Sequence, residues 1–139
     1  MRKSKLIVLF LFFLVFCQIT LAEQDKEEIA LTASKSWLTL IDEGRYSESW
    51  EKAATYFKNA VGKEQWKKLL VAFRKPLGKV LSRKLISKRY TKTLPGTPDG
   101  EYVVVQYRTR FENKSIGIET VTPMLDGDGK WRVSGYYIK

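Results

Sequence analysis

Glu119 is the residue of this sequence best suited to chemistry. It lies in a segment of alternating residues, so a strand would turn its carboxyl group toward one face of a sheet. An apolar surrounding would raise the pKa of that carboxyl and suit it to general acid–base work, with Tyr107 or Tyr137 as a partner. A structural ion pair with an inward-facing Arg83, or plain exposure to solvent, is the alternative that we favour.

Composition excludes several other chemistries. The chain has no histidine, and its single cysteine, Cys17, lies near the N-terminus. Ser-His-Asp and Cys-His catalysis are therefore excluded, together with most transition-metal sites. The segment Asp126-x-Asp128-Gly129 resembles the start of a calcium loop, but the twelfth position, which needs a carboxylate, is Tyr137. We expect a hairpin turn there, no metal site and no cofactor.

Residues 1–22 have the features of a signal peptide. A basic start is followed by an apolar run from Leu6 to Phe16, and Thr20 and Ala22 supply small residues for cleavage. We predict cleavage after Ala22 and export to the periplasm or beyond. The mature chain, residues 23–139, would be one domain without cysteine or membrane span. The alternative is an uncleaved anchor, although residues 6–22 only just reach the roughly 17–25 residues that cross a membrane.

The formal net charge is +10, and the positive excess is concentrated in residues 58–92, which hold 12 basic residues and one acid, Glu64. This distribution predicts a surface for an anionic envelope component. The alternative is a solvated face that keeps a small domain soluble. Nucleic acid is not an expected partner of an exported protein. The candidate residues for the anionic surface are Lys67, Lys68, Lys84, Lys88 and Lys92.

Arg74 begins the segment Arg74-Lys75-Pro76-Leu77-Gly78, which could hold an anion because a guanidinium group binds phosphate or carboxylate as a fork. A helix end stopped by proline and glycine is the interpretation that we favour. A small molecule bound inside the fold would meet the inward-facing candidates, which are Arg74, Arg83, Tyr107 and Glu119.

The periodicity of apolar residues predicts the elements that position these side chains. Three- and four-residue spacings, such as Ile29, Ala33 and Trp37, predict three helices. The first two lie at about residues 25–43 and 47–61, and the third contains Trp66 and Phe73 and is closed by Pro76 and Gly78. Two-residue spacing then predicts four strands, at 80–93, 101–111, 116–125 and 131–138. Short connections imply an antiparallel sheet, and the separation of helices from strands implies an α+β fold with the helices on one face.

The chain resembles a bacterial family of exported domains known as domain of unknown function 4019. The resemblance runs along nearly the whole mature chain. Its residues are Trp37, Leu40-Ile41-Asp42, Gly44, Tyr46, Ser49-Trp50, Trp66, Arg74, Pro76-Leu77-Gly78, Arg83, Leu94-Pro95-Gly96, Asp99-Gly100-Glu101-Tyr102, Glu119, Asp128-Gly129, Trp131-Arg132-Val133 and Gly135-Tyr136-Tyr137. By fold analogy this implies three N-terminal helices packed on a curved four-stranded antiparallel sheet, similar to the cystatin-like or nuclear-transport-factor-2-like cone. It implies no reaction and no ligand.

Three functions remain open at this point. The leading hypothesis is an exported, non-enzymatic module that binds a small molecule in the cone or an anionic envelope component. The second is a small enzyme of the isomerase or dehydratase type that uses Glu119 with Tyr107 or Tyr137. The third is a structural domain that forms a homodimer through its sheet.

Overall fold

The computed structural model describes the backbone of residues 2–139 and the side chains of residues 21–139. Most of the predicted leader, with Cys17, lies outside the described side chains. Within the described part of the chain, no helix is both long enough and apolar enough to cross a membrane. The elements follow one another as α1 (Arg2–Asp42), α2 (Tyr46–Glu51), α3 (Thr55–Ala60), α4 (Lys63–Phe73), the 3₁₀ helix η1 (Lys75–Leu77), β1 (Val80–Thr91), β2 (Tyr102–Phe111), β3 (Lys114–Leu125) and β4 (Trp131–Ile138).

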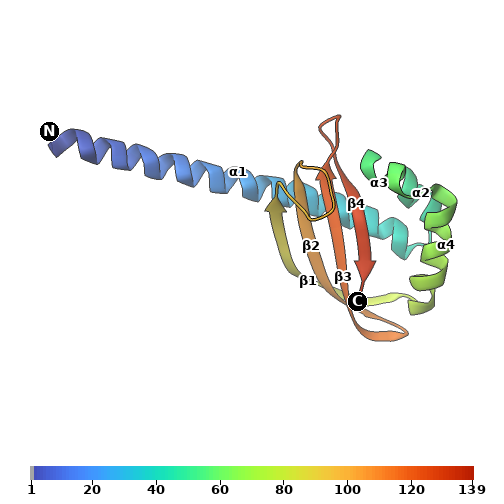
Figure 1. Ribbon diagram of the computed structural model, residues 1–139. Helices are drawn as coiled ribbons and strands as arrows, with labels where there is room; N and C mark the ends of the chain where they lie inside the picture. Colours follow the sequence, from blue (N-terminus) through green and yellow to red (C-terminus); the bar gives the residue numbers. More distant parts are fainter. Residues whose placement is uncertain (1) are drawn as a thin grey trace.

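The four strands form one antiparallel sheet in the order β1-β2-β3-β4. Helix α1 packs against all four strands, and the shorter helices gather near the β4 end of the sheet (Figure 1). The α+β fold expected from the order of periodicities is confirmed. Because the connections are short, neighbours in sequence are neighbours in the sheet, and β1 and β4 are its two free edges.

The core lies between α1 and the inner face of the sheet, which alternate residues of β2 such as Val103, Val105 and Tyr107 define. The expected stripe on α1 is partly wrong, because Ile29 is 57% exposed while Ala30 is fully buried. The small side chains of Ala30 and Ser34 face the sheet and let the helix approach it closely. A search for large apolar residues therefore begins the buried stripe at Ile29, whereas it begins at the smaller Ala30.

The second predicted helix is divided into α2 and α3. The break falls at Ala53 and Ala54, which are both fully buried. The backbone N–H of Ala54 donates to the carbonyl of Val133 in β4, at 2.8 Å, instead of to a helical carbonyl. Apolar periodicity continues through the break, but this contact with the sheet interrupts the helix.

Irregularities in register decide which side chains of an edge strand face inward. In β1 the register shifts between Leu85, which lies opposite Tyr107, and Ser87, which lies opposite Gln106. The alternation of apolar and polar residues in this segment would place Leu81 and Leu85 on the buried side of the strand, but they are 57% and 44% exposed. As part of a free edge, β1 has no further strand beside it to cover them.

Candidate functional site

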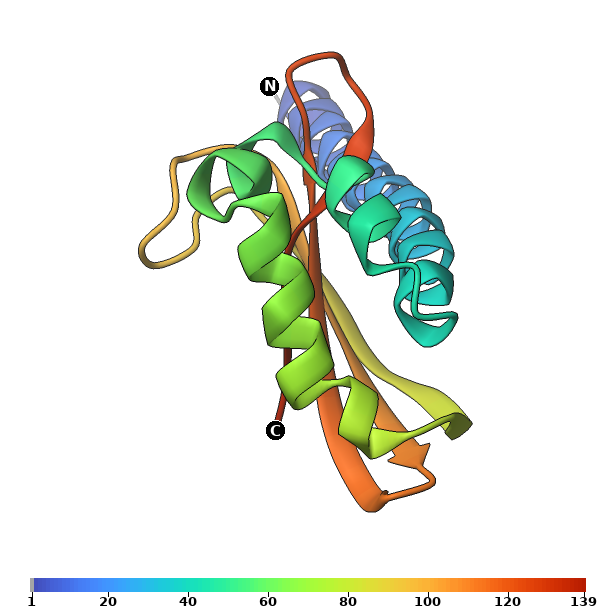
Figure 2. The same cartoon turned by 90° about the vertical axis from the view of Figure 1, so that its right-hand side faces the viewer.

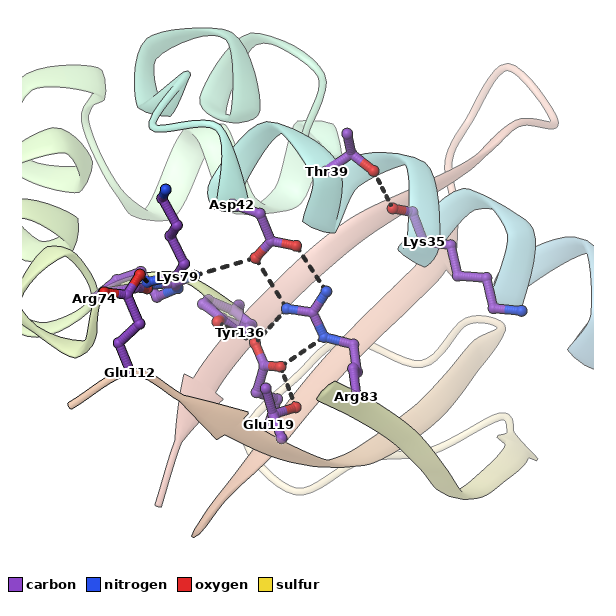
Figure 3. A network of polar contacts seen from close by, with 11 residues as sticks. Lys35, Thr39, Asp42, Arg74, Lys79, Arg83, Glu112, Glu119 and Tyr136 are labelled. Carbon is purple, nitrogen blue, oxygen red and sulfur yellow. Dashed lines mark hydrogen bonds and ion pairs between the residues drawn. The ribbon is translucent and has the colours of Figure 1, made fainter. Parts of the chain in front are cut away.

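Glu119 lies at the centre of a polar network on the inner face of the sheet (Figure 3). Its side chain is fully buried. Its Oε1 accepts hydrogen bonds from Arg83 Nε, at 2.7 Å, and from the hydroxyl of Thr109. Its Oε2 accepts from Arg83 Nη2, at 3.2 Å, and from the hydroxyl of Tyr136. Each carboxylate oxygen therefore has two donors, which fills its capacity as an acceptor.

Arg83 links this carboxylate to the end of α1. Its Nη1 and Nη2 donate to the two oxygens of Asp42, at 2.7 and 2.9 Å, so the guanidinium is held between two carboxylates. Arg74 approaches the same Asp42 with its Nη2, at 3.2 Å, and donates from Nη1 to the carbonyl of Gly78, at 2.8 Å. Asp42 is the last residue of α1, so the network ties that helix to β1, to β3 and to the chain after α4.

Burial and charge fix the protonation of two members of this network. Burial alone would lower the pKa of Arg83, but the hydrogen bonds to Asp42 and Glu119 outweigh it and raise that pKa above its ordinary value. Burial raises the pKa of the Tyr136 hydroxyl strongly, and the charge of Glu119 adds to the effect. Arg83 therefore stays charged and Tyr136 stays a donor. Such a network is suited to holding elements together.

The structure brings three of the four inward-facing candidates, Arg74, Arg83 and Glu119, into this network. The fourth, Tyr107, lies beside it, with its ring 6.0 Å from the Arg83 guanidinium. The Tyr107 hydroxyl is buried and has no hydrogen-bond partner within the described part of the chain, and its burial raises the pKa of the phenol. The expected ion pair of Glu119 with Arg83 is present.

The pairing of Glu119 with Tyr137 is wrong, because these two residues face opposite sides of the sheet. Tyr137 lies opposite Thr120, and the neighbouring Tyr136 reaches Glu119 instead. Counting alternate residues from the inward-facing Val133 selects position 137. A register shift in which Val133 pairs with Pro123 and Gly135 with Thr122 leaves residue 134 extra, so the inward parity moves to position 136. A proline inside β3 was the one signal of this bulge in the sequence.

The five candidate lysines do not form one surface. Lys84 lies opposite Arg108 on the outer face of the sheet, whereas Lys88, beyond the shift in β1, lies opposite the buried Val105 and pairs with Glu28 of α1. Lys67 and Lys68 belong to α4, where Lys67 pairs with Glu64, and Lys92 is exposed just after β1. The patch expected from the sequence is thus distributed over different sides of the molecule.

A cleft lies between α4 and the edge strand β4, and Figure 2 shows this helix running alongside the C-terminal strand. Its volume is about 450 Å³. Leu69 and Phe73 of α4 are 38% and 73% exposed there. The charged residues of its wall are both cations, Arg74 and Lys114, and the Nε of Arg74 is buried without a hydrogen-bond partner in the described chain. The wall consists of Trp66, Leu69, Leu70, Phe73, Arg74, Leu77, Lys114, Tyr136, Tyr137 and Ile138.

Residues 33–136 match the family described as "Protein of unknown function (DUF4019)". The chain belongs to this family. The resemblance expected from the sequence is confirmed, and the DUF4019 region includes the whole polar network and most of the cleft wall.

Among solved structures, one from Catenulispora acidiphila is similar to this DUF4019 chain, with a TM-score of 0.50 and 13% sequence identity. The alignment covers 89% of this chain and 94% of the other. At this identity the likeness concerns the fold alone. No match is found among curated proteins. The narrower analogy to cystatin-like or nuclear-transport-factor-2-like cones stays a prediction, as does self-pairing through the sheet.

Proposed function

We propose that this DUF4019 domain is an exported, non-enzymatic binding module. Its ligand is a small amphipathic molecule with an apolar body and a negatively charged end, held in the cleft between α4 and β4. The observation that carries this proposal is the wall of the cleft, which combines exposed apolar side chains with cations and has no carboxylate. The exposed apolar side chains are those of Leu69 and Phe73 on α4, and the cations are Arg74 and Lys114.

The size and polarity of the cleft support such a ligand. Pockets for small molecules commonly measure about 300–1,000 Å³ and are largely apolar with a few placed polar groups. Removing the exposed faces of Leu69 and Phe73 from water would contribute roughly 25 cal/mol for each Å² covered. The unpartnered Nε of Arg74 supplies a donor whose hydrogen bond is missing in the free protein. A carboxylate or phosphate group would satisfy it.

The environment of Glu119 favours binding over catalysis. A general base needs a free lone pair directed at the substrate, but four donors occupy both oxygens of this carboxylate. Glu119 is also absent from the wall of the cleft, and Tyr137 lies on the opposite side of the sheet from Glu119. The isomerase or dehydratase hypothesis therefore has no observation in its favour.

The position of the first contacts along α1 supports export with cleavage. Residues 21–25 are exposed, and Lys26 is the first of the described side chains in α1 to bond to a later part of the chain, at Glu101, which directly precedes β2. Glu27 and Glu28 follow, with bonds to the backbone of Tyr90 and to Lys88. Cleavage after Ala22 would leave all of these contacts in the mature chain.

Titration of the mature chain, residues 23–139, with dodecanoate tests the proposal. Trp66 in the cleft wall provides a fluorescence signal, and calorimetry gives the stoichiometry. We expect saturable binding at one site, and none with dodecyltrimethylammonium, which has the same tail and the opposite charge. Leu69→Asp should weaken binding at least tenfold, because it places a carboxylate in the apolar wall. This corresponds to a loss of binding free energy on the order of 1.4 kcal/mol or more.

Val71→Asp is the matched control, because Val71 is also exposed on α4, at 51%, but does not line the cleft. It should bind dodecanoate as the unsubstituted chain does. Equal weakening by both substitutions, or equal binding of the cationic amphiphile, would reject the proposed site or the proposed charge of the ligand. Absence of any saturable binding would reject the function.

A further inference from the structure

The outer face of the sheet carries positive charge without any negative charge. The four strands contain a single carboxylate, that of Glu119, and it points to the inner face. On the outer face, Lys84 lies opposite Arg108, Arg110 lies opposite Ser82, and Arg89 lies opposite Val104. Lys84, Arg89, Arg108 and Arg110 are all exposed, and we call them the outer cationic face.

The charges of this face are unpaired. None of the four side chains forms an ion pair with any residue of the described part of the chain. Lys84 and Arg108 are moreover direct cross-strand neighbours, and like charges in that position destabilise a sheet. A face arranged for stability alone would place an acid or a neutral residue at one of these two positions. The arrangement is explained if a negatively charged partner covers it.

Apolar side chains accompany these cations. Ile118 lies opposite Arg108, on the other side from Lys84. Ile116, two residues earlier, is 59% exposed, and Tyr137 of the outer face is 50% exposed. Lysine and arginine beside aliphatic and tyrosine side chains suit the boundary of a lipid bilayer, where the cations meet phosphate groups and the apolar groups meet the acyl region. A hydrated polysaccharide offers no apolar phase to the isoleucines.

We propose that the outer cationic face binds the surface of a membrane that contains anionic phospholipids. Helix α1 and the core lie on the opposite side of the sheet, so this contact leaves the buried network intact. The proposal is independent of the cleft, because none of the four cations belongs to the cleft wall. The residues differ from the lysines that charge distribution along the sequence suggests, with Lys84 the only one in common.

Cosedimentation of the mature chain with phosphatidylcholine vesicles, with and without phosphatidylglycerol, tests this proposal. We expect binding only to the vesicles with phosphatidylglycerol, and release at high salt because the Debye length falls to roughly 3 Å at 1 M. The double substitution Lys84→Ser/Arg108→Ser should lower the partition coefficient on the order of 30-fold. Circular dichroism establishes that this variant is folded.

Lys67→Ser/Lys68→Ser is the matched control, since it removes the same charge from α4, which is not part of the outer cationic face. It should change partitioning by no more than about threefold if binding depends on one face. An equal decrease of the partition coefficient in both double variants would mean that binding depends on net charge alone, and would overturn the proposal. Binding to heparin without binding to anionic vesicles would identify a soluble polyanion and overturn it as well. Leu69→Asp, which damages the cleft, should still bind the vesicles, so the two proposals fail separately.

Discussion

The charged side chains on the inner face of the sheet are paired, whereas the cations on its outer face have no acidic partner in the described part of the chain. On the inner face, Arg83 is shared between two carboxylates, and Glu119 accepts four hydrogen bonds. On the outer face, Lys84 and Arg108 lie opposite each other, and none of the four strands places a carboxylate on that face. Strand residues one position apart along the chain therefore belong to different electrostatic environments.

The difference shows that the number of charges says little about their role. Taking a charge out of water costs several kcal/mol, so a buried charge persists only with its partners, and its loss is expected to damage the fold. An exposed charge keeps its water, so an unpaired arrangement is tolerated at a small cost. The inner charges are therefore structural, whereas the outer ones are available to a partner. Three pairs of substitutions, each with a matched control, test this contrast.

Arg83→Met should have the largest effect. It would leave Glu119 buried with only two of its four donors and would remove the bidentate partner of Asp42. Breaking a buried ion pair by removing one partner typically costs about 3–5 kcal/mol. Urea denaturation of residues 23–139 measures the free energy of unfolding. Arg110→Met, the same replacement on the outer face, should change it by less than about 0.5 kcal/mol. Comparable losses in the two variants would erase the distinction between the faces.

Tyr136→Phe should have an intermediate effect. It removes a hydrogen bond to the Glu119 carboxylate, for which about 1.5–3 kcal/mol is expected, while Tyr137→Phe on the outer face should cost little. The pKa of Tyr136 is raised on folding, so its contribution is fully present below the unfolded pKa of about 10 and is lost as pH rises above it. Denaturation at pH 8 and pH 11 should therefore show a smaller difference between this variant and the parent at the higher pH. If the difference in unfolding free energy were the same at both pH values, the pKa of the Tyr136 hydroxyl would not be raised on folding.

Lys84→Thr should have the smallest effect, and its sign should be opposite. Removing one of two like charges that face each other across strands should stabilise the fold by about 0.2–1 kcal/mol, and added salt should reduce the gain. Arg89→Thr is the control, because Arg89 lies opposite the uncharged Val104 and its replacement changes strand propensity alone. A loss of stability at position 84 would indicate a favourable contact of Lys84 and would contradict the idea of an unpaired outer face.

Most of the fold was predictable from the sequence, because local patterns determine its elements. The change from helical to alternating periodicity near Val80 and the turn at residues 126–129 give the order of elements and the antiparallel sheet. The ion pair of Glu119 with Arg83 was also predictable, since both residues occupy inward positions in strands that the same sheet must contain. The stop of α1 near Gly44, whose φ of 73° favours glycine, follows from composition as well.

Register was not predictable in the same way. The choice between Tyr136 and Tyr137 as the partner of Glu119, and the separation of Lys84 from Lys88, depend on one extra residue in a strand. Beyond each such bulge, the positions that faced inward face outward and the reverse. Counting alternate residues along the sequence does not reveal where a bulge occurs. The same limit applies to the break between α2 and α3, which a hydrogen bond to Val133 produces.

The class of fold, the excess of positive charge and the absence of histidine follow from the amino-acid sequence alone, because they depend on residue types and on their spacing within one element. The pairing of charges, the location of the apolar cleft and the set of cations that share a face become known from the three-dimensional structure. These properties arise where separate elements meet, and their geometry depends on bulges and helix packing that no single segment encodes.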